Sequence, residues 1–141
     1  LKGPLGCLNQ ARYGIGWGAI GAAMNEYDVA LQNAKDRIQF DKPIASFQLI
    51  QDKLVWMFNE ITKGQLLAYK VGKNKDEGTL KHSQVYIVKR NNVWAARECI
   101  KLARGILGAN GITSGYIPLG AVLFSDKLLS DIKKESALLF F

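Results

Sequence analysis

The chain has 141 residues, of which 48% are hydrophobic and 22% are charged. This length fits one domain, and the composition is that of a chain that buries a core, which argues against intrinsic disorder. The net charge of +7 is spread along the sequence without a basic tract interleaved with aromatic residues, and no run reaches the roughly 20 apolar residues of a membrane-spanning helix. We therefore expect neither nucleic-acid binding nor membrane insertion.

Cysteine and histidine are too sparse to suggest a metal site. Cys7 and Cys99 lie far apart, and neither has a second Cys or a His at ligand spacing. His82 is the only histidine and has no nearby carboxylate or Cys in the sequence, so we interpret it as a surface residue near a helix start. We predict no metal and no disulfide.

Glycines interrupt the first helical segment. Gly14, Gly16, Gly18 and Gly21 each cost a helix about 0.5–1 kcal/mol relative to Ala, and small residues would let a neighbouring helix approach closely. The stretch from Gly16 to Gly21 also satisfies the dinucleotide pattern G-x-G-x-x-G. That pattern has meaning only after a β-strand, and the preceding residues 10–13 contain no β-branched side chain. We reject a dinucleotide-binding fold.

Two further segments carry apolar stripes at helical spacing. Pro43 suits the first turn of the second helix, and Thr79 suits the N-cap of the third. Apolar residues then recur every three or four positions. The stripe of the second segment is Phe47, Ile50, Leu54, Met57 and Ile61, and that of the third is Val85, Val88, Ala95, Cys99, Leu102 and Ile106, with polar Asn92 among them.

The residues after the third stripe predict a helix stop and a last helical segment. Gly108 and Gly111 tolerate the left-handed conformation that ends helices, and Pro118 opens a segment that runs to Phe141. No window alternates apolar and polar residues long enough to favour a strand. We therefore predict an all-α fold, an antiparallel up-down four-helix bundle, with residues 1–141 as a single helical-bundle domain.

Several motifs resemble the acyl-CoA dehydrogenase family, most of all the glutaryl-CoA dehydrogenases. Residues 5–15, L-G-C-L-N-Q-A-R-Y-G-I, are similar to the G-C-L-N-N-A-R-Y-G-I of the family's C-terminal domain. Residues 36–40, D-R-I-Q-F, with Pro43 resemble D-R-x-Q-F-G-x-P, and Gln48 stands at a family glutamine. Residues 107–112, L-G-A-N-G-I, resemble L-G-G-N-G-I. The resemblance covers roughly residues 3–116, and the family's N-terminal helical and middle β-domains have no counterpart in this sequence.

The resemblance implies a flavoenzyme that oxidises an acyl-CoA thioester to its enoyl-CoA, with FAD as cofactor. In glutaryl-CoA dehydrogenases, decarboxylation to crotonyl-CoA follows. The implied partners are an acyl-CoA (glutaryl-CoA or a related one), other copies of the chain in a dimer or tetramer, and electron-transfer flavoprotein for the full enzyme. The implied location is the cytoplasm of a bacterium or the mitochondrial matrix of a eukaryote.

The family motifs also assign residues to the two ligands. The residues that correspond to the acyl-CoA-contacting segment are Leu5, Gly6, Cys7, Leu8, Asn9, Gln10, Ala11 and Arg12. Those that correspond to FAD contacts, mostly with the FAD of a neighbouring subunit, are Arg37, Gln48, Gly105, Ile106, Leu107, Gly108 and Ala109. The residues alone leave other interpretations open: Arg37 as a surface charge, Arg12 as an ion-pair partner, and Gly108 as a helix stop.

Departures from the family pattern bear on activity. Ala109 and Asp41 replace family glycines, and Asp41 places a negative charge near the expected pyrophosphate site. The Y-E-G-T segment that supplies the catalytic glutamate is not found, and its spacing falls on apolar Ile132. The nearest acids are Asp126, Asp131 and Glu135, and no catalytic residue is assigned. We expect a chain that is inactive alone, and the alternative is a non-catalytic helical-bundle interaction module derived from the same family.

Overall fold

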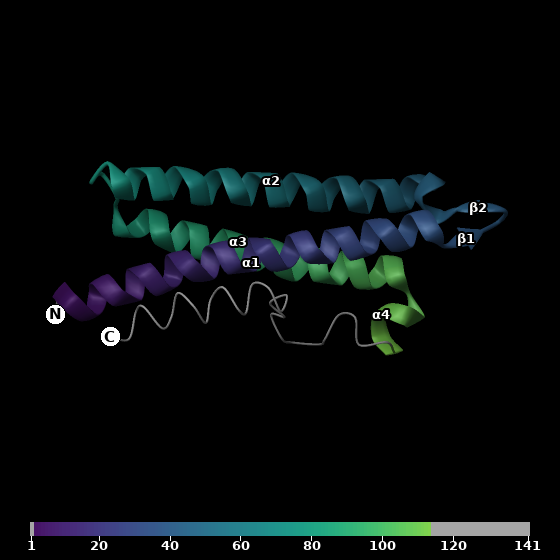
Figure 1. The fold of residues 1–141 in the computed structure, drawn as a ribbon, viewed down its shortest axis with the longest axis horizontal. Coiled ribbons are helices and arrows are strands. Elements are labelled where there is room, and N and C mark those ends of the chain that lie inside the picture. The colour runs from purple at the N-terminus through teal and green to yellow at the C-terminus, as the bar shows by residue number, and fades with distance from the viewer. Residues whose placement is uncertain (1, 114–141) are drawn as a thin grey trace.

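Three long antiparallel helices form the part of the chain that the computed structural model describes, residues 2–113. They are α1 (Lys2–Asp36), α2 (Gln48–Asp76) and α3 (His82–Leu107), and the short α4 (Ala109–Thr113) follows them. Figure 1 shows the up-down-up order, with α4 at the opposite end of the bundle from the N-terminus. The all-α antiparallel prediction is confirmed, and the predicted segment from Pro118 to Phe141 lies outside the described residues.

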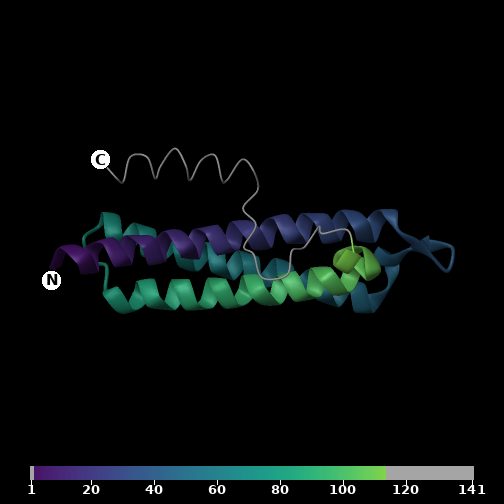
Figure 2. The same cartoon turned by 90° about the horizontal axis from the view of Figure 1, so that it is seen from below.

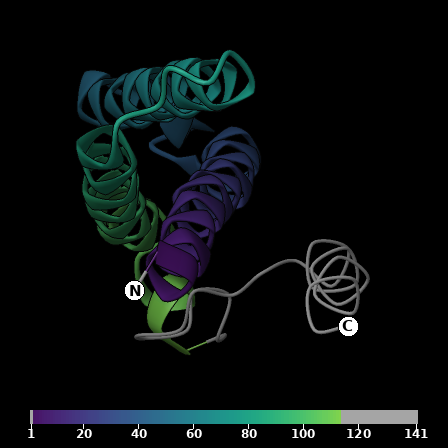
Figure 3. The same ribbon diagram turned by 90° about the vertical axis from the view of Figure 1, so that its left-hand side faces the viewer.

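The predicted apolar stripes form the core. The helices α1 and α3 pack closely along their length, and α2 covers both of them (Figures 2 and 3). Phe47, Ile50 and Leu102 are only partly buried. The stripe residues that are fully buried are Leu54, Met57, Ile61, Val85, Val88, Ala95, Cys99 and Ile106. None of the described helices is long and apolar enough to cross a membrane.

Small residues on α1 allow the close approach of α3. A Cβ atom at Gly16 would lie 2.7 Å from Cγ1 of Val88, so any larger residue at this crossing point would force Val88 to shift. A Cβ atom at Gly14 would meet nothing within 4 Å, so packing does not explain that glycine. The dinucleotide-like pattern lies inside the uninterrupted helix α1, which confirms that it is not a phosphate-binding turn.

The connection between α1 and α2 differs from the prediction. Strands β1 (Ile38–Gln39) and β2 (Lys42–Pro43) pair antiparallel, and the turn residues Phe40 and Asp41 have φ angles of 54° and 62°. Positive φ at both central residues is the geometry of a tight hairpin turn that matches strand twist. Strands of two residues are too short to show an alternating pattern, so periodicity could not predict them. The 3-10 helix η1 (Ile44–Ser46) follows, so α2 begins at Gln48 rather than at Pro43.

The start of α3 also differs from the prediction, whereas its end agrees. Lys81, not Thr79, is the N-cap of α3, and its backbone N–H donates to Oε1 of Gln84 at 3.0 Å. The Thr79 hydroxyl instead donates to the carbonyl oxygen of Asn74 at 3.3 Å and closes the turn. His82 is exposed at the first residue of α3, as expected. Gly108, with φ of 62°, ends α3 as its sequence predicts.

Candidate functional site

A cleft opens where the hairpin meets the C-terminal end of α3. We call it the hairpin cleft, and its volume is about 360 Å³. It is lined by Arg37, Gln39, Phe40, Ile44, Phe47, Leu49, Ile50, Gly105, Ile106 and Gly108. Residues far apart in the sequence therefore meet here, and four of them were predicted to contact FAD: Arg37, Gly105, Ile106 and Gly108.

Arg37 is held between α1 and the hairpin. Its backbone N–H donates to the carbonyl oxygen of Asn33 at 2.9 Å, and its own carbonyl oxygen accepts from Ile44 at 2.9 Å. Its guanidinium donates through Nη1 to the carbonyl oxygen of Leu107 at 3.3 Å. A guanidinium has five N–H donors in a planar fork, which suits the recognition of phosphate oxygens. Arg37 thus ties the hairpin to α3 and lines the cleft.

The glycines of the cleft leave its wall open to a ligand. A Cβ atom at Gly108 would lie 3.5 Å from Nη1 of Arg37, on a backbone with positive φ that side chains rarely adopt. A Cβ atom at Gly105 would meet only Nζ of Lys53, at 3.8 Å. A ligand can therefore approach the backbone between two cationic groups. These features fit a phosphate-bearing cofactor.

An aromatic wall completes the cleft, and its residues were not among those predicted to contact FAD. The rings of Phe40 and Phe47 pack edge to face with their centres 6.2 Å apart, and Nζ of Lys42 lies 4.6 Å from the centre of the Phe47 ring. Phe40 is 86% exposed and Leu49 is 80% exposed, which is unusual for such large apolar side chains. The Q-F of the family motif, in which the phenylalanine is Phe40, could have indicated this aromatic wall.

The other predicted FAD residues differ in their placement. Ile106 and Leu107 have buried side chains that belong to the core, so only their backbone faces a ligand. Gln48 is exposed at the first residue of α2 and does not line the hairpin cleft. Ala109 is exposed at the first residue of α4, just beyond the lining residues. The cleft is therefore built around Arg37 and the backbone from Gly105 to Gly108.

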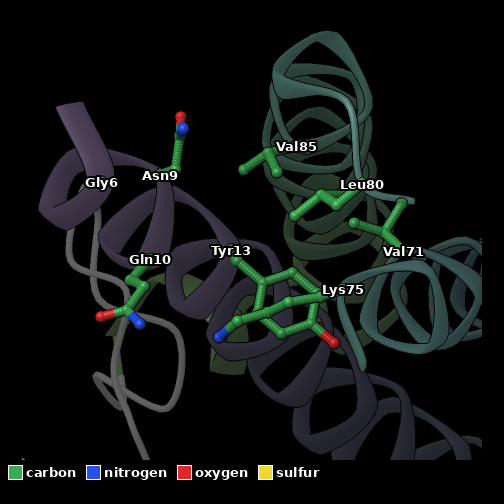
Figure 4. Close-up of a pocket in the computed structure, with 8 residues that line it drawn as sticks. All are labelled: Gly6, Asn9, Gln10, Tyr13, Val71, Lys75, Leu80 and Val85. Atoms are coloured by element: carbon green, nitrogen blue, oxygen red, sulfur yellow. The ribbon is translucent and has the colours of Figure 1, made fainter. Parts of the chain in front are cut away.

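The predicted acyl-CoA segment lies at the opposite end of the bundle. Gly6, Asn9 and Gln10 line a smaller cavity of about 210 Å³ between α1 and the α2–α3 turn (Figure 4). The remaining lining residues are Tyr13, Val71, Lys75, Leu80 and Val85. The Tyr13 hydroxyl donates to the carbonyl oxygen of Ala68 at 3.1 Å, and this bond joins α1 to α2 behind the cavity.

The rest of that segment faces other directions. Cys7, Leu8 and Ala11 are exposed on α1, with Leu8 48% exposed. The guanidinium of Arg12 lies over the ring of Tyr86, 4.7 Å from its centre, so Arg12 is a stacking partner of α3 rather than an ion-pair partner. The Asn9 amide contacts Nδ1 of His82. The side chain of Leu5 lies outside the described residues.

Titratable groups among the described residues do not form a catalytic cluster. No group of three or more His, Cys, Asp or Glu residues there could hold a metal ion. Burial raises the pKa of Cys99 to about 12, so this thiol is not a nucleophile. Glu26 is buried, its Oε2 atom has no hydrogen-bond partner in the described chain, and burial raises its pKa. Asp126, Asp131, Ile132 and Glu135 lie outside the described residues.

The comparisons identify the family of this chain. Residues 3–128 match the family described as acyl-CoA dehydrogenase, C-terminal domain, and the chain belongs to that family. It is 38% identical over 112 residues to a glutaryl-CoA dehydrogenase of Desulfococcus multivorans, a match that covers 79% of this chain and 29% of that protein.

Solved structures agree with this assignment. The crystal structure of glutaryl-CoA dehydrogenase from Mycobacterium smegmatis is similar at a TM-score of 0.80 and 43% identity, over 97% of this chain and 38% of that one. A glutaryl-CoA dehydrogenase from Mycobacterium smegmatis in complex with FADH2 is similar at a TM-score of 0.80 and 42% identity, over 84% of this chain and 31% of that one. This chain therefore spans about a third of the length of these relatives.

Proposed function

We propose that this chain is the C-terminal part of an FAD-dependent acyl-CoA dehydrogenase that acts on glutaryl-CoA or a related acyl-CoA. The observation that carries the proposal is the meeting of Arg37 with the Gly105–Gly108 backbone in the hairpin cleft. FAD held by Arg37 and the Gly105–Gly108 backbone would supply the hydride acceptor for the oxidation of the acyl-CoA to its enoyl-CoA, and a general base outside the hairpin cleft would take the proton. The relatives' names support glutaryl-CoA as the substrate. Decarboxylation of the product is what the family resemblance adds to the proposal.

The residues of the hairpin cleft have distinct roles in this proposal. Arg37 donates hydrogen bonds to phosphate oxygens, and Lys53 adds positive charge. Gly105 and Gly108 let the cofactor approach the backbone. Phe40 packs an apolar face against the cofactor. None of these groups removes a proton, so the domain binds and orients the cofactor.

The geometry supports a shared active site between subunits. Asn9 lies on α1, and Arg37 directly follows the last residue of that helix, so the 28 residues between them correspond to about 40 Å. An acyl-CoA held at Asn9 is therefore far from a cofactor held at Arg37 of the same chain. We infer that one copy contacts the substrate of its own active site and the FAD of a neighbouring copy, within a dimer or tetramer.

The isolated chain is expected to be inactive. It supplies part of each ligand site, and a missing general base alone typically costs about 10²–10⁴-fold in rate. The complete enzyme would pass its electrons to electron-transfer flavoprotein. It would work in the bacterial cytoplasm or, in a eukaryote, in the mitochondrial matrix.

Nuclear magnetic resonance of the ¹⁵N-labelled chain tests the proposal. FAD should shift the amide signals of Arg37, Gly105 and Gly108, and a non-oxidisable thioether analogue of glutaryl-CoA should shift those of Gly6 to Arg12. The two sets lie at opposite ends of the bundle, so the shifts should not overlap. The proposal fails if FAD shifts no signal around the hairpin cleft, or if it shifts only the opposite end.

A further inference from the structure

The smaller cavity between α1 and the α2–α3 turn has apolar walls, and we call it the turn cavity (Figure 4). Val71 and Val85 are buried in its walls, and Tyr13 and Leu80 also line it. These four side chains belong to an apolar cluster that is separate from the main core. An apolar cavity of about 150 Å³ stays dry and binds a benzene-sized molecule. The turn cavity, at about 210 Å³, is therefore large enough for a small apolar group.

The turn cavity is held open by contacts that lie outside it. The Tyr13 hydroxyl donates to the carbonyl oxygen of Ala68 at 3.1 Å and packs against Gly72, where a Cβ atom would collide with it. Both contacts hold the Tyr13 ring against α2, so the ring does not fill the cavity. On the α1 side, a Cβ atom at Gly6 would meet nothing within 4 Å, so the lining is open there. The cavity thus exists before a ligand binds, which lowers the cost of binding.

Lys75 is the only charged residue among the described residues that line the turn cavity. It is exposed, and none of the ion pairs among the described residues includes it. By contrast, Nζ of Lys73 lies 3.8 Å from Oε1 of Glu77, and Lys73 does not line the cavity. An exposed ammonium beside apolar walls attracts an anion whose charged end stays in water while its apolar end is buried. The turn cavity therefore suits a ligand with one apolar end and one anionic end.

We propose that the turn cavity binds a small carboxylate, with its apolar ring or chain between Tyr13, Val71 and Val85 and its charged group at Lys75. One ammonium balances the single charge of a carboxylate, whereas a phosphate group carries about two charges. The proposed flavoenzyme function does not require this site, because its buried walls lie outside the predicted acyl-CoA segment, residues 5–12. A free acid and the distal end of a dicarboxylic acyl-CoA present the same chemistry, and competition between the two distinguishes them.

Nuclear magnetic resonance of the chain with ¹³C-labelled Val and Leu methyl groups tests the site, with benzoate as the probe. Benzoate should shift the methyl signals of Val71, Leu80 and Val85, with a dissociation constant in about the millimolar range. Lys75→Met should raise this constant about two- to fivefold, as expected for one exposed charge pair. It should not change the binding of benzyl alcohol, which is neutral and of similar size. Lys73→Met removes the same charge outside the cavity and should change the binding of neither probe.

Gly6→Leu is a second variant that tests the cavity itself. It adds a side chain to the lining without a clash, and it replaces a glycine within a helix, so the fold should be kept. The variant should lose the benzoate-induced methyl shifts while its circular dichroism stays helical. Benzoate that shifts no methyl signal of the turn cavity overturns the proposal. Equal effects of Lys75→Met and Lys73→Met, or shifts that persist unchanged in Gly6→Leu, overturn it as well.

A thioether analogue of glutaryl-CoA identifies the source of the carboxylate. Displacement of benzoate by the analogue, weaker in Lys75→Met, supports the site with the distal end of an acyl-CoA as its ligand. Benzoate that stays bound beside the analogue supports the site with a free acid as its ligand. The hairpin cleft lies at the opposite end of the bundle, so FAD binding should be the same in all of these variants. Failure of the turn cavity as a carboxylate site therefore leaves the proposed cofactor site standing.

Discussion

The side-chain amide of Asn92 donates a hydrogen bond to the carbonyl oxygen of Gly16 at 3.2 Å. A second bond of 3.2 Å runs from the same nitrogen to the carbonyl oxygen of Gly64, so one side chain on α3 holds the backbones of α1 and α2. Asn92 is completely buried. Because these bonds fix how the three helices sit against one another, they also fix where the two ligand sites lie.

Asn92→Asp should destabilise the fold strongly. A carboxylate cannot donate to the two carbonyl oxygens, and an unpaired charge would be buried at the centre of the bundle. We expect a loss of about 3 kcal/mol or more at neutral pH, measured by urea unfolding with circular dichroism. Asn25→Asp, an exposed site on α1, should change the unfolding free energy by less than about 0.5 kcal/mol. Equal effects at both sites would contradict this role of Asn92.

Gly64 and Gly14 should respond to alanine in opposite directions. A Cβ atom at Gly64 would lie 2.4 Å from Cδ1 of Ile20 and 3.0 Å from Oδ1 of Asn92, whereas one at Gly14 would meet nothing within 4 Å. Gly64→Ala should therefore cost about 1–3 kcal/mol, and Gly14→Ala should stabilise by about 0.5–1 kcal/mol. Adding Ile20→Val to Gly64→Ala should recover part of the loss. Purely additive effects in that double-mutant cycle would argue against the contact.

Asp41→Gly should stabilise the hairpin. Asp41 has a φ of 62°, a conformation that glycine adopts without cost and that this turn type prefers at its second central residue. We expect a gain of about 0.5–1 kcal/mol in thermal or urea unfolding. Asp41→Asn removes the same negative charge but keeps a side chain, so it separates charge from conformation. If both variants strengthen FAD binding equally, the charge is what weakens it; if neither does, Asp41 does not affect the cofactor.

Glu26→Gln should stabilise the fold in a pH-dependent way. Burial raises the pKa of Glu26 above its ordinary value of 4.5. At a pH between the ordinary pKa and the raised pKa, the folded chain binds the proton more tightly than the unfolded chain. The unfolding free energy of the wild type should therefore fall as the pH rises through this window. The advantage of Glu26→Gln should be largest at neutral pH and shrink as the pH falls to 4.5. Asn25→Gln, a change between two neutral side chains at an exposed site on the same helix, should show no such trend.

Helical periodicity was sufficient to predict the helices and much of their core. Leu54, Met57 and Val88 are buried where their spacing placed them, because a helix must bury its apolar stripe. The strands at the hairpin could not be predicted, because two residues carry no periodic signal. The N-cap of α3 is Lys81 and not the predicted Thr79, because the Thr79 hydroxyl donates to the carbonyl oxygen of Asn74 within the turn.

The candidate site was predictable only through the family motifs. Nothing in the spacing of Arg37 and Gly108 indicates that they meet, since 70 residues and two helix reversals separate Arg37 from its bonding partner Leu107. Gln48 matched a motif but lies outside the hairpin cleft in the single chain. The exposure of Phe58 and Leu66 on α2 was also hidden, because they lie beside the core stripe in the sequence and only the structure shows them exposed.

The most direct test of the proposed function is a titration of the purified chain with FAD, followed by flavin fluorescence, with Arg37→Ala as the variant. Arg90→Ala is the matched control, because it removes the same charge from an exposed site on α3, about 26 Å along the helix from its C-terminal end. We predict weak, saturable binding in the micromolar to sub-millimolar range. Arg37→Ala should weaken it by about tenfold or more, and Arg90→Ala should leave it unchanged. FAD binding that Arg37→Ala leaves unchanged would contradict the assignment of the hairpin cleft to the cofactor. So would the absence of FAD binding to a chain that remains folded and helical.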